Sequence, residues 1–140
     1  MILSLFLMMF FLYAAPVAAE NVISDKALKE LEQKYEFLEA LRVMETHVKD
    51  FPEDYAVQFR IANYLFYGRK GVAADRQKAR MIYGTLLRSL IEMQNKTPEI
   101  LYMTGIAVSN SSGDTVSAFK WLMESANQGY PPAEAEVAFR

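Results

Sequence analysis

His47 is the residue with the widest chemical use in this 140-residue chain, because it is the only histidine and the chain has no cysteine. A histidine-activated nucleophile needs a reactive hydroxyl or thiol beside the imidazole, and a zinc site needs several histidine or cysteine ligands. Glu45 and Asp50 are near His47 in sequence and could in principle join it at a metal. The competing interpretation, which we adopt, places His47 on the surface of an amphipathic helix.

The remaining residues supply no other chemical site. Gly68 and Gly71 do not form a phosphate-binding loop, because we expect their turn to connect two helices rather than a strand and a helix. We therefore assign no catalytic, cofactor-binding or metal-binding residue, expect no cofactor, and predict that the chain is not an enzyme. Its formal charge of −2 gives no electrostatic reason for binding nucleic acid.

Two stretches of the sequence, 56–89 and 99–133, repeat the same pattern of helix, turn and helix. Aligning Ala62 with Gly105 gives a period of 43 residues for the first helices. Aligning Asp75 with Asp114 gives a period of 39 residues for the second helices. Repetition at this spacing is typical of an α-solenoid, in which each helical pair buries its apolar face on a neighbour. The sequence therefore predicts an all-α fold made of stacked helical pairs.

Local signals place the helix ends within these repeats. The first helix should run from about Tyr55 to Tyr67, with Gly71 at positive φ in the turn and Val72 folded back as an apolar plug. Asp75 should cap the following helix. Thr97 and Pro98 should begin the leading helix of the second pair.

Residues 20–55 precede the repeats and read as a capping helix or as the second helix of a degenerate repeat. An apolar stripe predicts one continuous helix from Ser24 to Asp50, ended by Pro52. Its apolar members recur at steps of three and four residues, and they are Leu28, Leu31, Tyr35, Leu38, Leu41 and Val48.

The repeats resemble the Sel1-like family, which is related to the tetratricopeptide repeat. The first copy, 56–90, matches the family pattern at Ala56, Ile61, Ala62, Gly68, Gly71, Val72, Asp75, Lys78, Ala79 and Tyr83. The second copy, 97–130, matches at Gly105, Gly113, Asp114, Ala118, Trp121, Ala126 and Gly129, with Ala133 beyond it. The resemblance implies a short α/α solenoid that acts as an adaptor between proteins. Some Sel1-like proteins are associated with β-lactam hydrolysis, but those are cysteine-rich, and this chain lacks that framework.

A partner is expected on the concave face, which the first helix of each pair lines in such solenoids. Tyrosine, arginine and methionine are residue types that contribute strongly to binding. The predicted partner-binding residues are Arg60, Asn63, Tyr64, Tyr67, Tyr102, Met103 and Ile106. The alternative for the tyrosines is that they fill the core between the repeats. The expected partner is a protein or a peptide.

The N-terminal segment, 1–19, resembles a signal peptide. Its apolar core, 2–15, is shorter than a membrane-spanning helix and precedes Pro16, and small residues then lead to a cleavage site between Ala19 and Glu20. No Lys or Arg precedes that core, so an uncleaved segment that tethers the chain to a membrane as an assembly factor is the alternative. We expect a periplasmic or secreted protein, or one in the endoplasmic reticulum lumen if the source is eukaryotic.

Residues 131–140 read as the start of a truncated third repeat. Val137 and Phe139 are apolar and have no second helix to cover them. We expect either weak self-association through this end or a relative of a longer repeat array. Trp121, the only tryptophan, is expected between the last complete pair and its predecessor.

Overall fold

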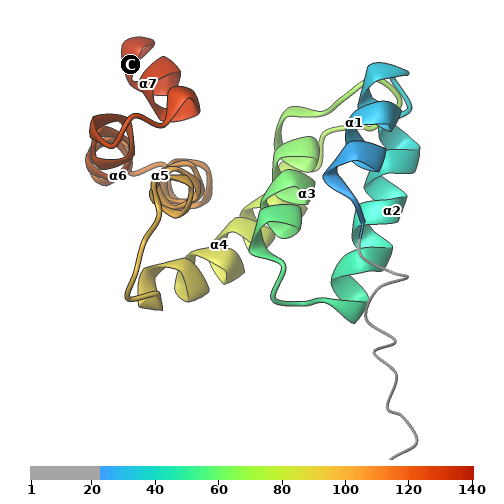
Figure 1. Cartoon of the computed structure of the whole chain (residues 1–140), viewed down its shortest axis with the longest axis horizontal. Coiled ribbons are helices and arrows are strands. Elements are labelled where there is room, and N and C mark those ends of the chain that lie inside the picture. Colours follow the sequence, from blue (N-terminus) through green and yellow to red (C-terminus); the bar gives the residue numbers. More distant parts are fainter. Residues whose placement is uncertain (1–22) are drawn as a thin grey trace, which may run out of the picture.

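The computed structural model describes residues 23–140, and this part of the chain consists of helices joined by short turns (Figure 1). The predicted all-α fold is confirmed. The helices are α1 (Asp25–Gln33), α2 (Phe37–Asp50), α3 (Tyr55–Tyr67), α4 (Arg76–Glu92), α5 (Pro98–Ser112), α6 (Thr115–Asn127) and α7 (Pro131–Ala138). The predicted signal segment and the site between Ala19 and Glu20 lie outside the described residues.

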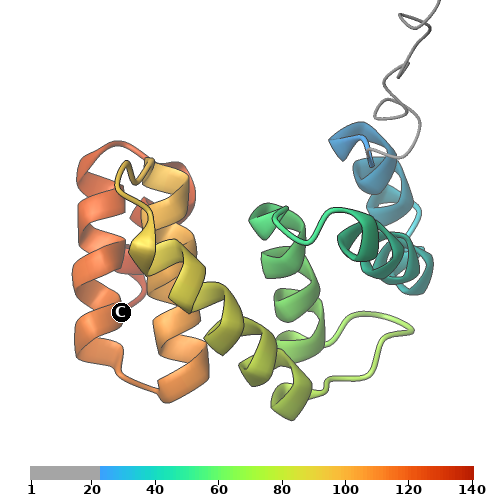
Figure 2. The same ribbon diagram turned by 90° about the horizontal axis from the view of Figure 1, so that it is seen from below.

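The helices fall into two groups. Figures 1 and 2 show α1, α2 and α3 on one side and α5, α6 and α7 on the other, with α4 running between them. None of the helices within 23–140 has both the length and the apolar character that a membrane span requires.

The helix starts follow the two periods that the sequence predicts. Helices α3 and α5 begin at Tyr55 and Pro98, 43 residues apart, while α4 and α6 begin at Arg76 and Thr115, 39 residues apart. The caps repeat as well: Asp75 accepts a hydrogen bond from the Lys78 backbone N–H and Asp114 accepts one from that of Ser117, each at 3.0 Å. The two pairs, α3 with α4 and α5 with α6, therefore have matching local structure.

Small residues let the helices of each pair approach closely. Ala62 of α3 and Ala79 of α4 are fully buried, as is Ala118 of α6. Gly105 of α5 packs so tightly against α6 that an added Cβ would lie 2.7 Å from Leu122 Cγ. Ridges of one helix thus enter grooves of the next at positions with little or no side chain.

The turn between α3 and α4 confirms the predicted roles of Gly71 and Val72. Gly71 has φ +78°, in the left-handed region that glycine tolerates. Val72 is buried, and its backbone N–H donates to the carbonyl of Arg69 at 2.8 Å. At the next pair, Thr97 caps α5 by accepting from the Ile100 N–H at 3.3 Å, and Pro98 is the first helical residue.

The prediction of one helix from Ser24 to Asp50 is wrong. Ser24 does cap α1, but that helix ends at Gln33 and α2 begins at Phe37. Tyr35 lies between them with φ +58°, a conformation that breaks a helix and is uncommon for a bulky residue. The break turns α2 about its axis relative to the predicted stripe. Leu38 is therefore exposed, while α2 buries Ala40, Leu41, Met44 and His47.

Trp121 does not fill the core between the two complete pairs. It is partly exposed, and the ammonium of Lys96, in the connection between α4 and α5, lies 5.9 Å from its ring centroid. The next residue, Leu122, occupies the fully buried position against Gly105. The core position that we predicted for Trp121 is thus taken by the following residue, Leu122.

Candidate functional site

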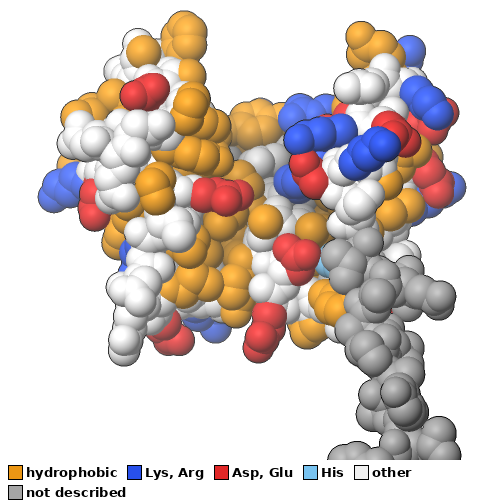
Figure 3. Space-filling model, in the orientation of Figure 1, with side chains coloured by type: hydrophobic (Ala, Val, Ile, Leu, Met, Phe, Trp, Pro, Cys, Tyr) orange, Lys and Arg blue, Asp and Glu red, His pale blue; other side chains and the backbone are white. Residues whose placement is uncertain are grey.

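A hollow between the two groups of helices is the main concave feature of the face in Figure 3. Hydrophobic side chains gather on its α5–α7 wall, and Lys and Arg side chains appear on the opposite wall. Elements on both sides of the hollow supply three exposed or partly exposed tyrosines: Tyr67 of α3, Tyr102 of α5 and Tyr130, which directly precedes α7. A hollow with walls of this kind offers apolar contact and charge to a bound chain.

Three tyrosines, Tyr67, Tyr102 and Tyr130, form what we call the tyrosine cluster. The ring of Tyr102 lies 5.5 Å from that of Tyr130 and 6.0 Å from that of Phe59, edge to face with the latter. Burial raises the pKa of Tyr102, and the nearby carboxylate of Glu136 raises it further. Burial likewise raises the pKa of Tyr130, so the hydroxyls of Tyr102 and Tyr130 hold their protons more strongly than an exposed tyrosine and can donate hydrogen bonds.

A network of hydrogen-bonded polar side chains contacts the cluster at Tyr67. The Tyr83 hydroxyl donates to Asn63 Oδ1, and the Asn110 amide donates to the Tyr83 hydroxyl at 3.2 Å and to that of Tyr67 at 3.3 Å. Tyr83 is fully buried, so its hydroxyl needs these partners, and burial raises its pKa. The network ties α3, α4 and α5 together and orients Tyr67, whose side chain is 57% exposed.

Arg60 and Tyr64 link α3 to α1. The Arg60 guanidinium lies 3.0 Å from Asp25 and 2.8 Å from Glu32, and the Tyr64 hydroxyl donates to the same Glu32 oxygen. Burial acts to raise the pKa of Glu32, but the hydrogen bonds from Tyr64 and Arg60 outweigh it and lower that pKa. The polar groups of Arg60 and Tyr64 thus hold the first helix in place.

The seven predicted partner-binding residues divide into two sets. Tyr64, Met103 and Ile106 are buried, so the prediction that they face a partner is corrected for these three, which pack between helices. Tyr67 is exposed, and Arg60, Asn63 and Tyr102 are partly exposed. These four stay predicted binding residues, now joined by Tyr130.

The repeat period is the signal that could have found the network residues. Asn110 stands 43 residues after Tyr67, and Tyr102 stands 43 residues after Phe59. Equivalent positions of α3 and α5 therefore contact each other across the two copies. The sequence gives no comparable signal for Tyr130, which follows α6 outside the aligned leading helices.

His47 is buried, not on the surface as predicted. Its side chain is 2% exposed, its ring stacks on Phe51 at 4.8 Å, and its Nε2 lies 2.7 Å from Asp54 Oδ2. Asp54 also caps α3 by accepting from the Val57 N–H. His47 thus stabilises the turn between α2 and α3 through its contacts with Phe51 and Asp54.

The described residues around His47 do not form the metal site that Glu45 and Asp50 could have completed. Glu45 pairs with Lys78, and residues 23–140 contain no group of three histidine, cysteine or acidic residues that could hold a metal ion.

Comparison of the chain with protein-family models, with curated protein sequences and with solved structures finds no match. The functional argument therefore rests on the residues and on the geometry of the hollow.

Proposed function

We propose that this protein is an exported helical-repeat scaffold that mediates protein–protein interaction, acting as an adaptor in the bacterial envelope. In this proposal the helical pairs are Sel1-like or tetratricopeptide-like repeats, and α1 with α2 forms a degenerate N-terminal pair. The agreement of the helix starts with periods of 43 and 39 residues supports the repeat assignment.

The tyrosine cluster, where α3, α5 and the turn before α7 meet, is the single observation that carries the binding function. Tyr67, Tyr102 and Tyr130 present aromatic surface and hydroxyl groups, a combination that contributes strongly at interfaces. Hydrogen bonds and ring contacts hold Tyr67 and Tyr102 in place before a partner arrives. Such preorganisation reduces the entropy lost on binding.

Charge substitution at the cluster tests this function. Tyr67→Glu places a carboxylate on an exposed ring position, whereas Val116→Glu does the same on the exposed surface of α6. Affinity purification from extracts of the native host should recover a partner with the wild type and with Val116→Glu, and lose it with Tyr67→Glu. Recovery of the partner in equal amounts with both variants would show that the tyrosine cluster is not the binding site.

Export rests on the N-terminal segment and needs its own test. N-terminal sequencing of the protein from its native host should begin at Glu20 if the segment is removed. A sequence that begins at Met1 would instead support the membrane-tethered assembly factor.

A further inference from the structure

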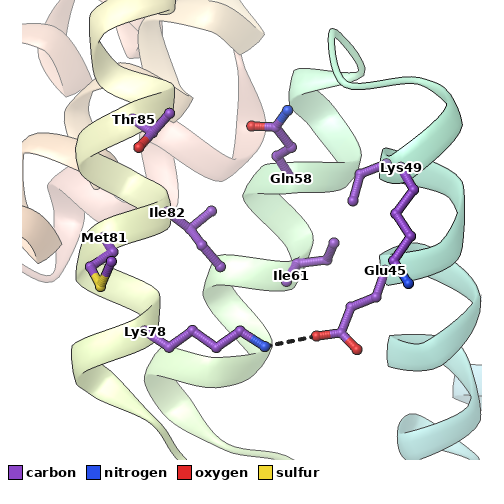
Figure 4. Close-up of a pocket in the computed structure, with 9 residues that line it drawn as sticks. Glu45, Lys49, Gln58, Ile61, Lys78, Met81, Ile82 and Thr85 are labelled. Carbon is purple, nitrogen blue, oxygen red and sulfur yellow. Dashed lines mark hydrogen bonds and ion pairs between the residues drawn. The ribbon is translucent and has the colours of Figure 1, made fainter.

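A second concave surface lies between α2 and α4, and we call it the α2–α4 groove. It has a volume of about 630 Å³, within the range of about 300–1,000 Å³ that is typical of binding pockets. Figure 4 shows α2 and α4 as its two walls, with α3 between them. Ile61 of α3 forms part of the floor.

The groove is separate from the hollow that carries the proposed function. Successive helical residues are about 100° apart, so Gln58 and Ile61, which line the groove, lie on the opposite side of α3 from Asn63 and Tyr67. A partner in the groove would therefore not compete with one at the tyrosine cluster.

Apolar side chains dominate the groove wall formed by α4. Met81 is 68% exposed, and Ile82 beside it is partly exposed. Val48 faces them from α2. Leaving these side chains in water is unfavourable, and methionine adapts readily to the shape of a bound chain.

The backbone of the groove walls excludes one mode of peptide binding. Both walls are helices, whose backbone groups are hydrogen-bonded internally, so no strand edge is available for an extended peptide to join. Side chains alone can make the contacts. An amphipathic helix, which projects its apolar residues from one face, suits a trough between two helices.

The charges that line the groove determine which helix fits. Glu45 of α2 and Lys78 of α4 form an ion pair of 3.0 Å that spans the groove (Figure 4). Lys49, one turn further along α2, lines the same groove and has no ion-pair partner among residues 23–140. The lining therefore carries one uncompensated positive charge beside an apolar surface.

We propose that the α2–α4 groove binds an amphipathic helix of a partner protein, with apolar residues against Met81 and Ile82 and an acidic residue facing Lys49. Burial of the methionine and isoleucine side chains supplies the affinity. The carboxylate opposite Lys49 sets the direction of the helix and discriminates against basic helices.

Three synthetic 16-residue helical peptides provide the probe. The first has leucines along one face and a glutamate at the edge of that face. The second has lysine in place of the glutamate, and the third has glutamine in place of the leucines. Methyl NMR of the full-length protein reports where each peptide binds, with Met81, Ile82 and Ile61 as groove signals and Met123 of α6 as the reference.

The first peptide should shift the groove methyl signals at submillimolar concentration and leave Met123 unchanged, while the third should shift neither. Met81→Glu should weaken the first peptide at least about tenfold, because it places a carboxylate in the apolar contact. Val116→Glu is the matched control, since Val116 is 69% exposed, on α6, and should have no effect. Lys49→Glu should weaken the first peptide about fivefold and strengthen the second.

Three results would overturn the proposal. One is an absence of groove shifts at millimolar peptide. Another is that the wild type and the Lys49→Glu variant each bind the glutamate peptide and the lysine peptide with equal affinity. The third is a shift of the groove methyl signals on raising the protein concentration alone, which would identify a second copy of the chain as the occupant. Met81→Glu and Lys49→Glu lie outside the tyrosine cluster, so these results do not test the binding function proposed for that cluster.

Discussion

Gly105→Ala should destabilise the protein although alanine is the better helix former. Gly105 lies inside α5, where replacing glycine by alanine at an unobstructed position gains about 0.8–1.0 kcal/mol. Its new Cβ would, however, lie 2.7 Å from Leu122 Cγ and 3.1 Å from the Ala118 carbonyl oxygen. Overpacking of this kind costs about 1–3 kcal/mol, and the backbone contact favours the upper part of that range. The net loss of unfolding free energy should be about 1–2 kcal/mol.

Gly84 provides the matched control for this substitution. It lies inside α4, and a Cβ added there meets no atom within 4 Å. Gly84→Ala should therefore stabilise the protein by about 0.8–1.0 kcal/mol through helix propensity alone. The two variants change the same atoms and differ only in the space around them.

Chemical denaturation of the two variants, together with Leu122→Ala and the Gly105→Ala/Leu122→Ala pair, measures the contact. Leu122→Ala alone should cost about 2–5 kcal/mol. In its background Gly105→Ala should cost less than in the wild type, because the leucine atoms that oppose the new Cβ are gone. Equal stabilisation by Gly84→Ala and Gly105→Ala would refute the close approach of α5 and α6.

Three further predictions concern other parts of the fold. Trp121→Ala should cost about 1–2 kcal/mol, less than Leu122→Ala in the same denaturation assay, because Trp121 is partly exposed; an equal or greater cost would place it in the core. Glu32 has a lowered pKa, so its contribution is present above its ordinary value of 4.5 and is lost as the pH falls through the lowered pKa. The stability difference between wild type and Glu32→Gln should therefore shrink from pH 6 to pH 3, and parallel denaturation midpoints would contradict this. Phe139, at the end of α7, is 92% exposed. In analytical ultracentrifugation the wild type should self-associate weakly, and Phe139→Glu should abolish that association. A wild type that stays monomeric at high micromolar concentration would exclude self-association through Phe139.

The helical pairs were predictable because their signals are local and repeated. Asp75 and Asp114 mark the starts of α4 and α6 as capping residues, and Thr97 with Pro98 marks that of α5. The two periods then relate the copies, and with them the contact between equivalent positions of α3 and α5.

The break between α1 and α2 was not predictable, because no glycine or proline accompanies the positive φ of Tyr35. That break changes which residues of α2 are buried and so places His47 inside the fold. Its partner Asp54 lies beyond Pro52, on the far side of a turn that periodicity does not describe.

The candidate site was only partly predictable, since periodicity does not separate an exposed face from one covered by a neighbour. Helix α5 buries every residue from Met103 to Val108, which leaves no polar face over that stretch. Met103 therefore has a residue type that is common in binding surfaces but lies in the core, and Ile106 lies in the core with it.

Site-specific photo-crosslinking at the tyrosine cluster tests the central claim most directly. A photoreactive phenylalanine analogue at position 67 resembles the native ring and takes an exposed position of the tyrosine cluster, and the same analogue at position 116 serves as the control. In the native host, position 67 should yield one discrete protein adduct that position 116 does not yield. Absence of an adduct at position 67, or the same adduct at both positions, would contradict a scaffold that binds its partner through this face.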